Sequence, residues 1–227
     1  MHFLILALLL VLAIFGPQWW AASVLRRHGQ ARPDYPGTGG EFARHLLSQF
    51  QIDSVNVEST ERGDHYDPET RTVRLTPDKL NGKSLTAITV AAHEVGHAIQ
   101  HHLNYAPLAW RSRLVRLAQT AEKTGSGIMM VLPIVALVTR SPAAGLVTFL
   151  LGLGGMAVST IVHLVTLPVE WDASFGRAMP LLQAGRYLNK ADEKAARRIL
   201  QACALTYFAS SLASLLSIWR WLRLWRR

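Results

Sequence analysis

The chain has 227 residues, of which 50% are hydrophobic and only 17% are charged, enough for one domain or for a small soluble lobe with several membrane spans. Its net charge of +9 comes from basic residues beside apolar runs, where they would meet anionic lipid headgroups, so we expect no nucleic-acid partner. A single cysteine, Cys203, excludes an internal disulfide and a cysteine-rich zinc site.

Residues 1–23 form an almost wholly apolar N-terminal segment. Its length of about 20 residues suits a spanning helix, and Trp19 and Trp20 near its end suit a membrane interface. Positive charge follows the apolar stretch, at Arg26 and Arg27, whereas a secretory signal peptide carries it in front. We therefore expect a retained transmembrane anchor.

Residues 24–124 are expected to form a catalytic lobe of mixed helix and strand. Apolar spacing predicts a helix from Glu41 to Phe50. Alternating residues predict strands at Val55 to Glu58 and Thr72 to Thr76, separated by the turn-rich segment Asp64 to Pro68. A strong helix follows over residues 84–102.

The second half of the chain alternates apolar and polar segments. Residues 125–167 contain two apolar runs joined at Arg140 and Ser141, which predicts a transmembrane helical hairpin. Residues 168–201 are polar and helical in pattern. Residues 202–227 begin with about 18 uncharged residues and end in a basic tail, which predicts a fourth span.

Four spans would place residues 26–123 and 168–202 on the same side of the membrane. These two segments hold 19 of the 24 Lys and Arg residues, against five in the turn and the tail. The positive-inside rule therefore predicts that this side is cytoplasmic, although the basic tail speaks against it.

The motif His93-Glu94-Val95-Gly96-His97 lies within the predicted helix 84–102. Four residues advance a helix by about 400°, so the two imidazoles share one face and can bind one Zn²⁺. Glu94 lies beside that face, where it can take a proton from a metal-activated water attacking a peptide carbonyl. Small and apolar neighbours such as Ala91 and Ala92 disfavour a chance match on a solvated helix.

A third ligand must come from elsewhere in the chain. The metzincin pattern is excluded, because Gln100 and Leu103 stand where it requires Gly and His. His101 is one turn beyond His97 and is one candidate. Glu170 is the better one, because a carboxylate on a second helix would complete a two-His-one-Glu set.

Glu170 is expected in the first turn of a helix that Thr166 caps and that has Pro168 near its start. Asp172 is expected either to orient a ligand imidazole or to lie on the surface. The strand Thr72 to Thr76 is expected to pair with substrate backbone, and His65 or Tyr66 to stabilise the oxyanion. The alternative is that Asp67 and Pro68 simply form a turn.

At these residues the chain resembles the YugP-like family of membrane zinc metallopeptidases. The resemblance covers most of the chain and is carried by five pieces: Asp64 to Pro68, Val90 to His101, Tyr105 to Leu108, Leu167 to Ser174, and Ala204 to Tyr207. It implies a zincin similar in plan to HtpX and the prenyl-protein endopeptidases. His93, His97 and Glu170 would then bind zinc and Glu94 would be catalytic, while Ser174 stands where the HtpX group has Asp.

These observations predict a mainly α, multi-span membrane protein with a small α+β zincin-like lobe. The expected function is zinc-dependent endopeptidase activity on membrane proteins or membrane-proximal polypeptides. The expected location is the cell membrane. The alternative is a non-hydrolytic zinc-binding membrane adaptor or scaffold, which Glu94 disfavours because a purely structural site closes its fourth position with another ligand. The sequence indicates neither the substrate nor the oligomeric state.

Overall fold

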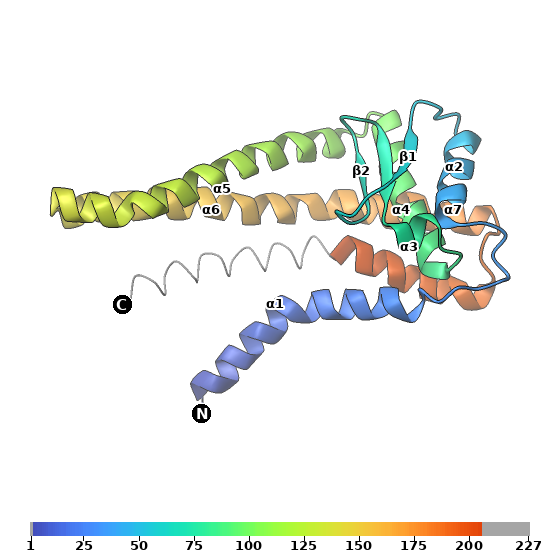
Figure 1. Cartoon of the computed structure of the whole chain (residues 1–227), viewed down its shortest axis with the longest axis horizontal. Helices are drawn as coiled ribbons and strands as arrows, with labels where there is room; N and C mark the ends of the chain where they lie inside the picture. The colour runs from blue at the N-terminus through green and yellow to red at the C-terminus, as the bar shows by residue number, and fades with distance from the viewer. Residues whose placement is uncertain (1, 206–227) are drawn as a thin grey trace. The chain divides into compact units, whose positions relative to one another are not determined.

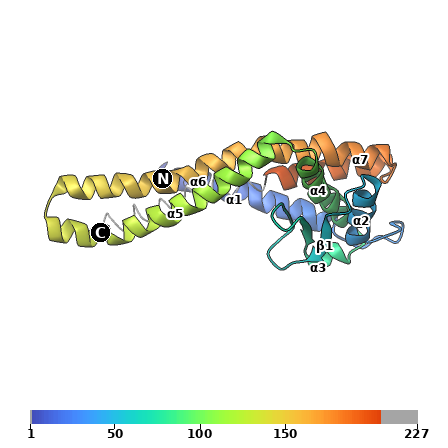
Figure 2. The same cartoon turned by 90° about the horizontal axis from the view of Figure 1, so that it is seen from above.

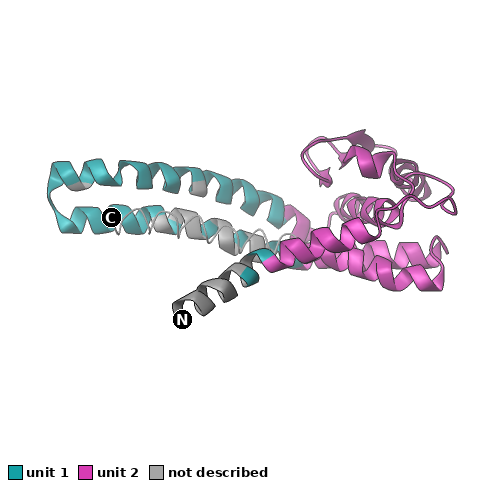
Figure 3. Cartoon of the chain, turned by 60° about the horizontal axis from the view of Figure 1, so that its bottom comes forward, with its two compact units in different colours: residues 1–15, 110–167, 207–227 teal, residues 16–109, 168–206 magenta. Residues whose placement is uncertain are grey.

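The computed structural model describes the backbone of residues 2–205. Side chains in this range are described except those of residues 2–11, 13, 14, 122, 136, 153, 155–157, 159–161 and 163–165. The chain divides into two compact units (Figure 3), one of residues 1–15, 110–167 and 207–227, the other of residues 16–109 and 168–206. The second unit joins the predicted catalytic lobe to the segment after the hairpin, and it contains all the candidate site residues.

The second unit is a helical body with one small sheet. Its first part runs in the order α1 (His2–Arg27, from Gly16 on), α2 (Gly39–Gln49), β1 (Asn56–Ser59), β2 (His65–Asp67), β3 (Thr72–Leu75), α3 (Pro77–Leu80) and α4 (Leu85–His102). Its second part comprises the end of α6 (Pro142–Trp171), then η1 (Asp172–Ala178), α7 (Met179–Ala184) and a helix that covers residues 190–205.

The helix α4 forms the centre of this unit. Ser84 caps it by accepting a hydrogen bond from the backbone N–H of Ala87 at 3.1 Å. Every residue from Leu85 to Gln100 is buried, as the small and apolar composition of this stretch predicts. Ionisable side chains on a helix that is buried on all faces are costly unless they are paired or bind an ion, so its histidines and glutamate cannot be ordinary surface residues.

The sheet has the order β1-β3-β2. β1 pairs with β3 in parallel, with Val57 opposite Val73, and β2 pairs with β3 antiparallel, with Tyr66 opposite Val73. The prediction that Thr72 to Thr76 pairs with substrate was therefore wrong, because β3 already has a neighbour on each side. The segment expected to be a turn instead supplies the edge strand β2.

The first unit contains most of α5 (Ala106–Thr139) and α6. The two helices run side by side as an antiparallel hairpin (Figures 1 and 2). They approach closely at Gly152, where an added Cβ would lie 2.5 Å from Cγ of Met129. Large apolar side chains nevertheless point outward, including Ile134 at 62% exposure and Leu137 at 75%.

Both hairpin helices are longer than the sequence predicts. α5 begins at Ala106, before its apolar part, and α6 continues through Pro168 to Trp171. Thr166 therefore lies inside α6, and the prediction that it caps a new helix was wrong. Proline inside a helix usually kinks or breaks it, but α6 continues through Pro168 for three more residues.

Four membrane spans were predicted, and among the described residues one helix, α5, is long and apolar enough to cross a membrane. A shorter apolar stretch covers Pro142–Gly152. The helix α1 extends over the predicted N-terminal anchor. The predicted fourth span and basic tail lie almost wholly in residues 206–227, outside the described residues.

Candidate metal centre

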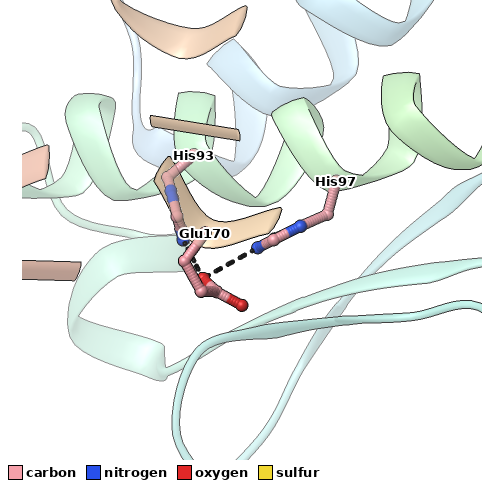
Figure 4. A group of neighbouring side chains, drawn as sticks. All are labelled: His93, His97 and Glu170. Carbon is pink, nitrogen blue, oxygen red and sulfur yellow. Dashed lines mark hydrogen bonds and ion pairs between the residues drawn. The ribbon is translucent and has the colours of Figure 1, made fainter. Parts of the chain in front are cut away.

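Three buried side chains from two helices converge in the second unit. His93 and His97 project from successive turns of α4, and Glu170 approaches them from the end of α6 (Figure 4). The Oε2 atom of Glu170 lies 3.3 Å from Nε2 of His93 and 3.2 Å from Nε2 of His97. The ligand atoms of all three lie within 4.8 Å of one another.

Two of these distances match the edge of a tetrahedral metal site. Zinc binds histidine nitrogen and carboxylate oxygen at about 2.0–2.1 Å, so neighbouring ligand atoms of a tetrahedron lie about 3.3–3.4 Å apart. The two distances to Glu170 are close to that edge. Two neutral imidazoles and one carboxylate are a donor set that zinc prefers, and three protein ligands leave a fourth position open.

The tautomer of His97 is set by Gln100. The side-chain oxygen of Gln100 lies 2.9 Å from Nδ1 of His97. A glutamine oxygen can only accept, so Nδ1 carries the proton and Nε2 presents its lone pair toward Glu170 and the candidate metal position. This is the form of imidazole that a metal requires.

The tautomer of His93 is set in the same way by Ser174. The hydroxyl of Ser174 donates to the backbone carbonyl of Leu200 at 3.2 Å and lies 3.1 Å from Nδ1 of His93. Because a hydroxyl has one hydrogen and gives it to Leu200, it accepts from the Nδ1–H of His93. Nε2 of His93 is therefore also the bare nitrogen.

Asp172 acts on the site through Gln100. The Gln100 amide nitrogen donates to Oδ2 of Asp172 at 2.8 Å and to the backbone carbonyl of Val169 at 3.0 Å. Arg177 in turn donates to the same Asp172 oxygen at 3.3 Å. These bonds fix which end of the Gln100 amide faces His97. Sequence reasoning missed Gln100 and Arg177, and it expected Asp172 either to orient a ligand imidazole or to lie on the surface.

The π-helix η1 begins directly after the Glu170 turn. It packs against α4 at Gly96, where an added Cβ would lie 2.7 Å from the backbone oxygen of Ala173. A wider helical turn and a glycine in the opposing helix let the two backbones approach closely. This contact holds Glu170, Asp172 and Ser174 beside the histidines of α4.

Glu94 and His101, the other candidates on α4, are not among the three converging side chains. Glu94 is buried on α4, about 100° around the helix axis from His93. His101, the alternative third ligand, is not in the converging group; its Nδ1 lies 2.8 Å from the hydroxyl of Tyr66. Burial raises the pKa of Tyr66 to about 12, so its phenol stays neutral at physiological pH.

The other polar residues near β2 make structural contacts. Asp64 accepts hydrogen bonds from the backbone N–H and the hydroxyl of Thr76 and pairs with Lys79 at 3.0 Å. The Nδ1 atom of His65 lies 2.8 Å from the backbone oxygen of Gly63. These contacts tie the segment before β2 to the end of β3.

Comparisons with known proteins agree with this chemistry. A model of the family described as "Putative neutral zinc metallopeptidase" matches residues 3–226. The chain is similar to the "Putative membrane protease YugP" of Bacillus subtilis (strain 168), with 34% identity over 224 residues that cover 95% of this chain and 94% of the relative. No solved structure matches the chain.

Proposed function

This chain belongs to the family described as putative neutral zinc metallopeptidases, and from that premise we propose that it is a zinc-dependent membrane endopeptidase. Its substrates are membrane proteins or polypeptide segments close to the bilayer. The observation that carries the proposal is the convergence of two imidazole nitrogens and one carboxylate oxygen in a buried site. Both imidazoles are held in the tautomer that binds a metal.

Each residue has a defined task in this proposal. His93, His97 and Glu170 hold the ion, and Gln100 and Ser174 hold the imidazoles in place. Bound zinc supplies a Lewis acid that lowers the pKa of water to about 7 and polarises the scissile carbonyl. Glu94 takes the proton from the attacking water on its carboxylate and delivers it to the leaving amine.

The free edge of the sheet suits an extended substrate. β2 is an edge strand, and Tyr66 on it contacts His101 of the metal-binding helix. A peptide adding to this edge would gain backbone hydrogen bonds that do not depend on its sequence. We therefore assign to β2 the substrate-pairing role that sequence reasoning gave to β3.

The apolar exterior of the α5–α6 hairpin supports a location in the membrane. Side chains such as Ile134 and Leu137 have no cover within the described residues, which is expected where lipid replaces water. We propose that the protein is multi-pass, that α1 and residues 202–227 also cross the membrane, and that the metal centre lies on the cytoplasmic side. The distribution of Lys and Arg supports that orientation.

The substitution Glu94→Gln separates this function from that of a zinc-binding scaffold. We expect the variant to retain zinc and to lose cleavage of a membrane-protein substrate in proteoliposomes by about 100-fold or more, because an amide cannot accept the proton. Glu61→Gln, which changes an exposed carboxylate in the loop between β1 and β2, is the matched control. Equal cleavage by Glu94→Gln and wild type would refute the catalytic role.

A further inference from the structure

A polar cavity lies at the C-terminal end of α4, the helix that carries His93 and His97. Its volume is about 250 Å³, and its wall is formed by the C-terminal end of α4, the β2–β3 hairpin and the segment before β1. The lining residues with polar side chains are Ser54, Tyr66, Arg71, His101, His102 and Asn104. These side chains include a guanidinium and two imidazoles, and no carboxylate lines the cavity.

The guanidinium of Arg71 is available to a ligand. Among the described residues it makes no ion pair, unlike Arg74 on the same hairpin, which pairs with Asp67 at 2.6 Å. Arg71 also has a left-handed backbone conformation with φ of 51°, which favours glycine or asparagine. A long cationic side chain at such a position carries a small conformational cost.

The Tyr66–His101 pair always has one hydrogen left to donate. If Tyr66 donates to Nδ1 of His101, the imidazole keeps its proton on Nε2. If Nδ1 donates instead, the phenol hydrogen of Tyr66 remains free. Within the described chain no acceptor takes this hydrogen, so the cavity offers it beside the Arg71 guanidinium in either tautomer.

The cavity lies along the face of α4 that carries Glu94. Ala98 and His101, which line the cavity, follow Glu94 by four and seven residues and so lie on the same side of the helix. At 1.5 Å per residue, His101 is about 10 Å along the axis from Glu94. An extended peptide covers that distance in about three residues.

We propose that this cavity binds a carboxylate of the peptide substrate, about three residues from the bond that is cleaved. The inference rests on the proposed peptidase function and adds a substrate preference to it. The carboxylate belongs either to an acidic side chain or to the C-terminus of the substrate. Arg71 supplies the charge, and the Tyr66–His101 pair supplies a neutral hydrogen bond.

The test uses the full-length protein with zinc in detergent micelles and two sets of peptides. One set pairs Glu with Gln at positions two to four residues on either side of the cleaved bond, and another pairs a C-terminal carboxylate with a carboxamide. We expect the wild type to favour the carboxylate member of one set by about 10-fold in kcat/KM, because hydrogen bonds to charged groups are the strong ones. The set that shows the preference identifies the source of the carboxylate.

Arg71→Gln should abolish this preference, and Tyr66→Phe should reduce it. The matched control is Arg186→Gln, since Arg186 is also exposed and left-handed, with φ of 51°, but does not line the cavity. A wild type without the preference, or an Arg71→Gln variant that keeps it, would overturn the proposal.

A binding assay separates this inference from the peptidase function. The Glu94→Gln variant should bind the carboxylate peptide about 10-fold more tightly than its neutral partner, even if the wild type hydrolyses neither. Absence of cleavage with this binding preference would count against the peptidase function alone. Cleavage without any binding preference would count against the carboxylate site alone.

Discussion

Soluble proteins usually bury apolar side chains and expose polar ones, and the metal centre and the α5–α6 hairpin depart from this rule in opposite ways. The centre buries polar and ionisable groups, with Glu170 fully buried, whereas the hairpin exposes large apolar side chains. Buried polar groups are costly unless they are paired, and exposed apolar groups are costly only in water. The first region is therefore expected to hold a cation and the second to lie in lipid. Four predictions test this contrast.

The largest effect is expected from a charge on the hairpin. Ile134→Arg places a cation among exposed apolar residues of α5, and an Arg at the centre of a spanning helix costs about 2.5–3.5 kcal/mol. The fraction of protein that resists alkaline extraction from membranes should fall sharply. Leu103→Arg, at an exposed position of the other unit, should leave that fraction unchanged. Equal extraction of the two variants would mean that the hairpin is not in lipid.

A methyl group added in each region should have opposite effects. Gly96→Ala would push a Cβ against the backbone of Ala173, which we expect to cost about 1–3 kcal/mol of stability and to weaken zinc binding. At Gly127 of α5 the same Cβ meets nothing within 4 Å, so Gly127→Ala should be neutral or stabilise its helix by up to about 1 kcal/mol. Thermal unfolding measures both. An unaffected Gly96→Ala variant would disprove the close α4–η1 contact.

Gln100→Leu removes the side chain that fixes the His97 tautomer. The substitution keeps the volume but leaves Nδ1 of His97 without its acceptor, and zinc affinity should fall by about 10–100-fold. Gln183→Leu, at an exposed position of α7, is the control. Competition with a fluorescent chelator gives the affinity. An unchanged affinity would show that His97 does not need Gln100.

Ser174→Ala should have the smallest effect of the four. It removes the acceptor for Nδ1 of His93 without changing the charge, and the lost hydrogen bond is worth about 0.5–1.5 kcal/mol. Zinc affinity should therefore fall by less than in Gln100→Leu. Ser174→Asp should restore or exceed it, because a carboxylate accepts more strongly from the Nδ1–H. A loss in Ser174→Ala larger than in Gln100→Leu would reverse the assigned order of the two contacts.

Local patterns in the sequence predicted the parts of the fold that depend on neighbouring residues. The helix around His93 was expected at residues 84–102 and spans Leu85–His102, because its cap and its apolar composition are local signals. Parts that depend on distant contacts were missed. Thr166 resembles a helix cap, yet α6 runs through it, and β3 is central because β2 and β1 both pair with it.

The candidate site shows the same division. The spacing of His93 and His97 is a helix property and is visible in the sequence. The part played by Gln100 is not, because it depends on Val169 and Asp172, about 70 residues away in the chain. Arg177 contacts Asp172 within the same helical turn, but its bearing on the site depends on the same distant Gln100. A polar residue inside an otherwise small and apolar helix was the only signal that could have identified Gln100.

The central claim is that His93, His97 and Glu170 together hold one zinc ion. The most direct measurement is the zinc content and affinity of the purified full-length protein, compared with Glu170→Ala and with Glu61→Ala, which changes an exposed loop residue. We expect one zinc per chain in the wild type and in Glu61→Ala. Glu170→Ala should lose more zinc affinity than the roughly 10–100-fold that is lost when a residue that only orients a ligand is removed. Full zinc occupancy and unchanged affinity in Glu170→Ala would contradict the account.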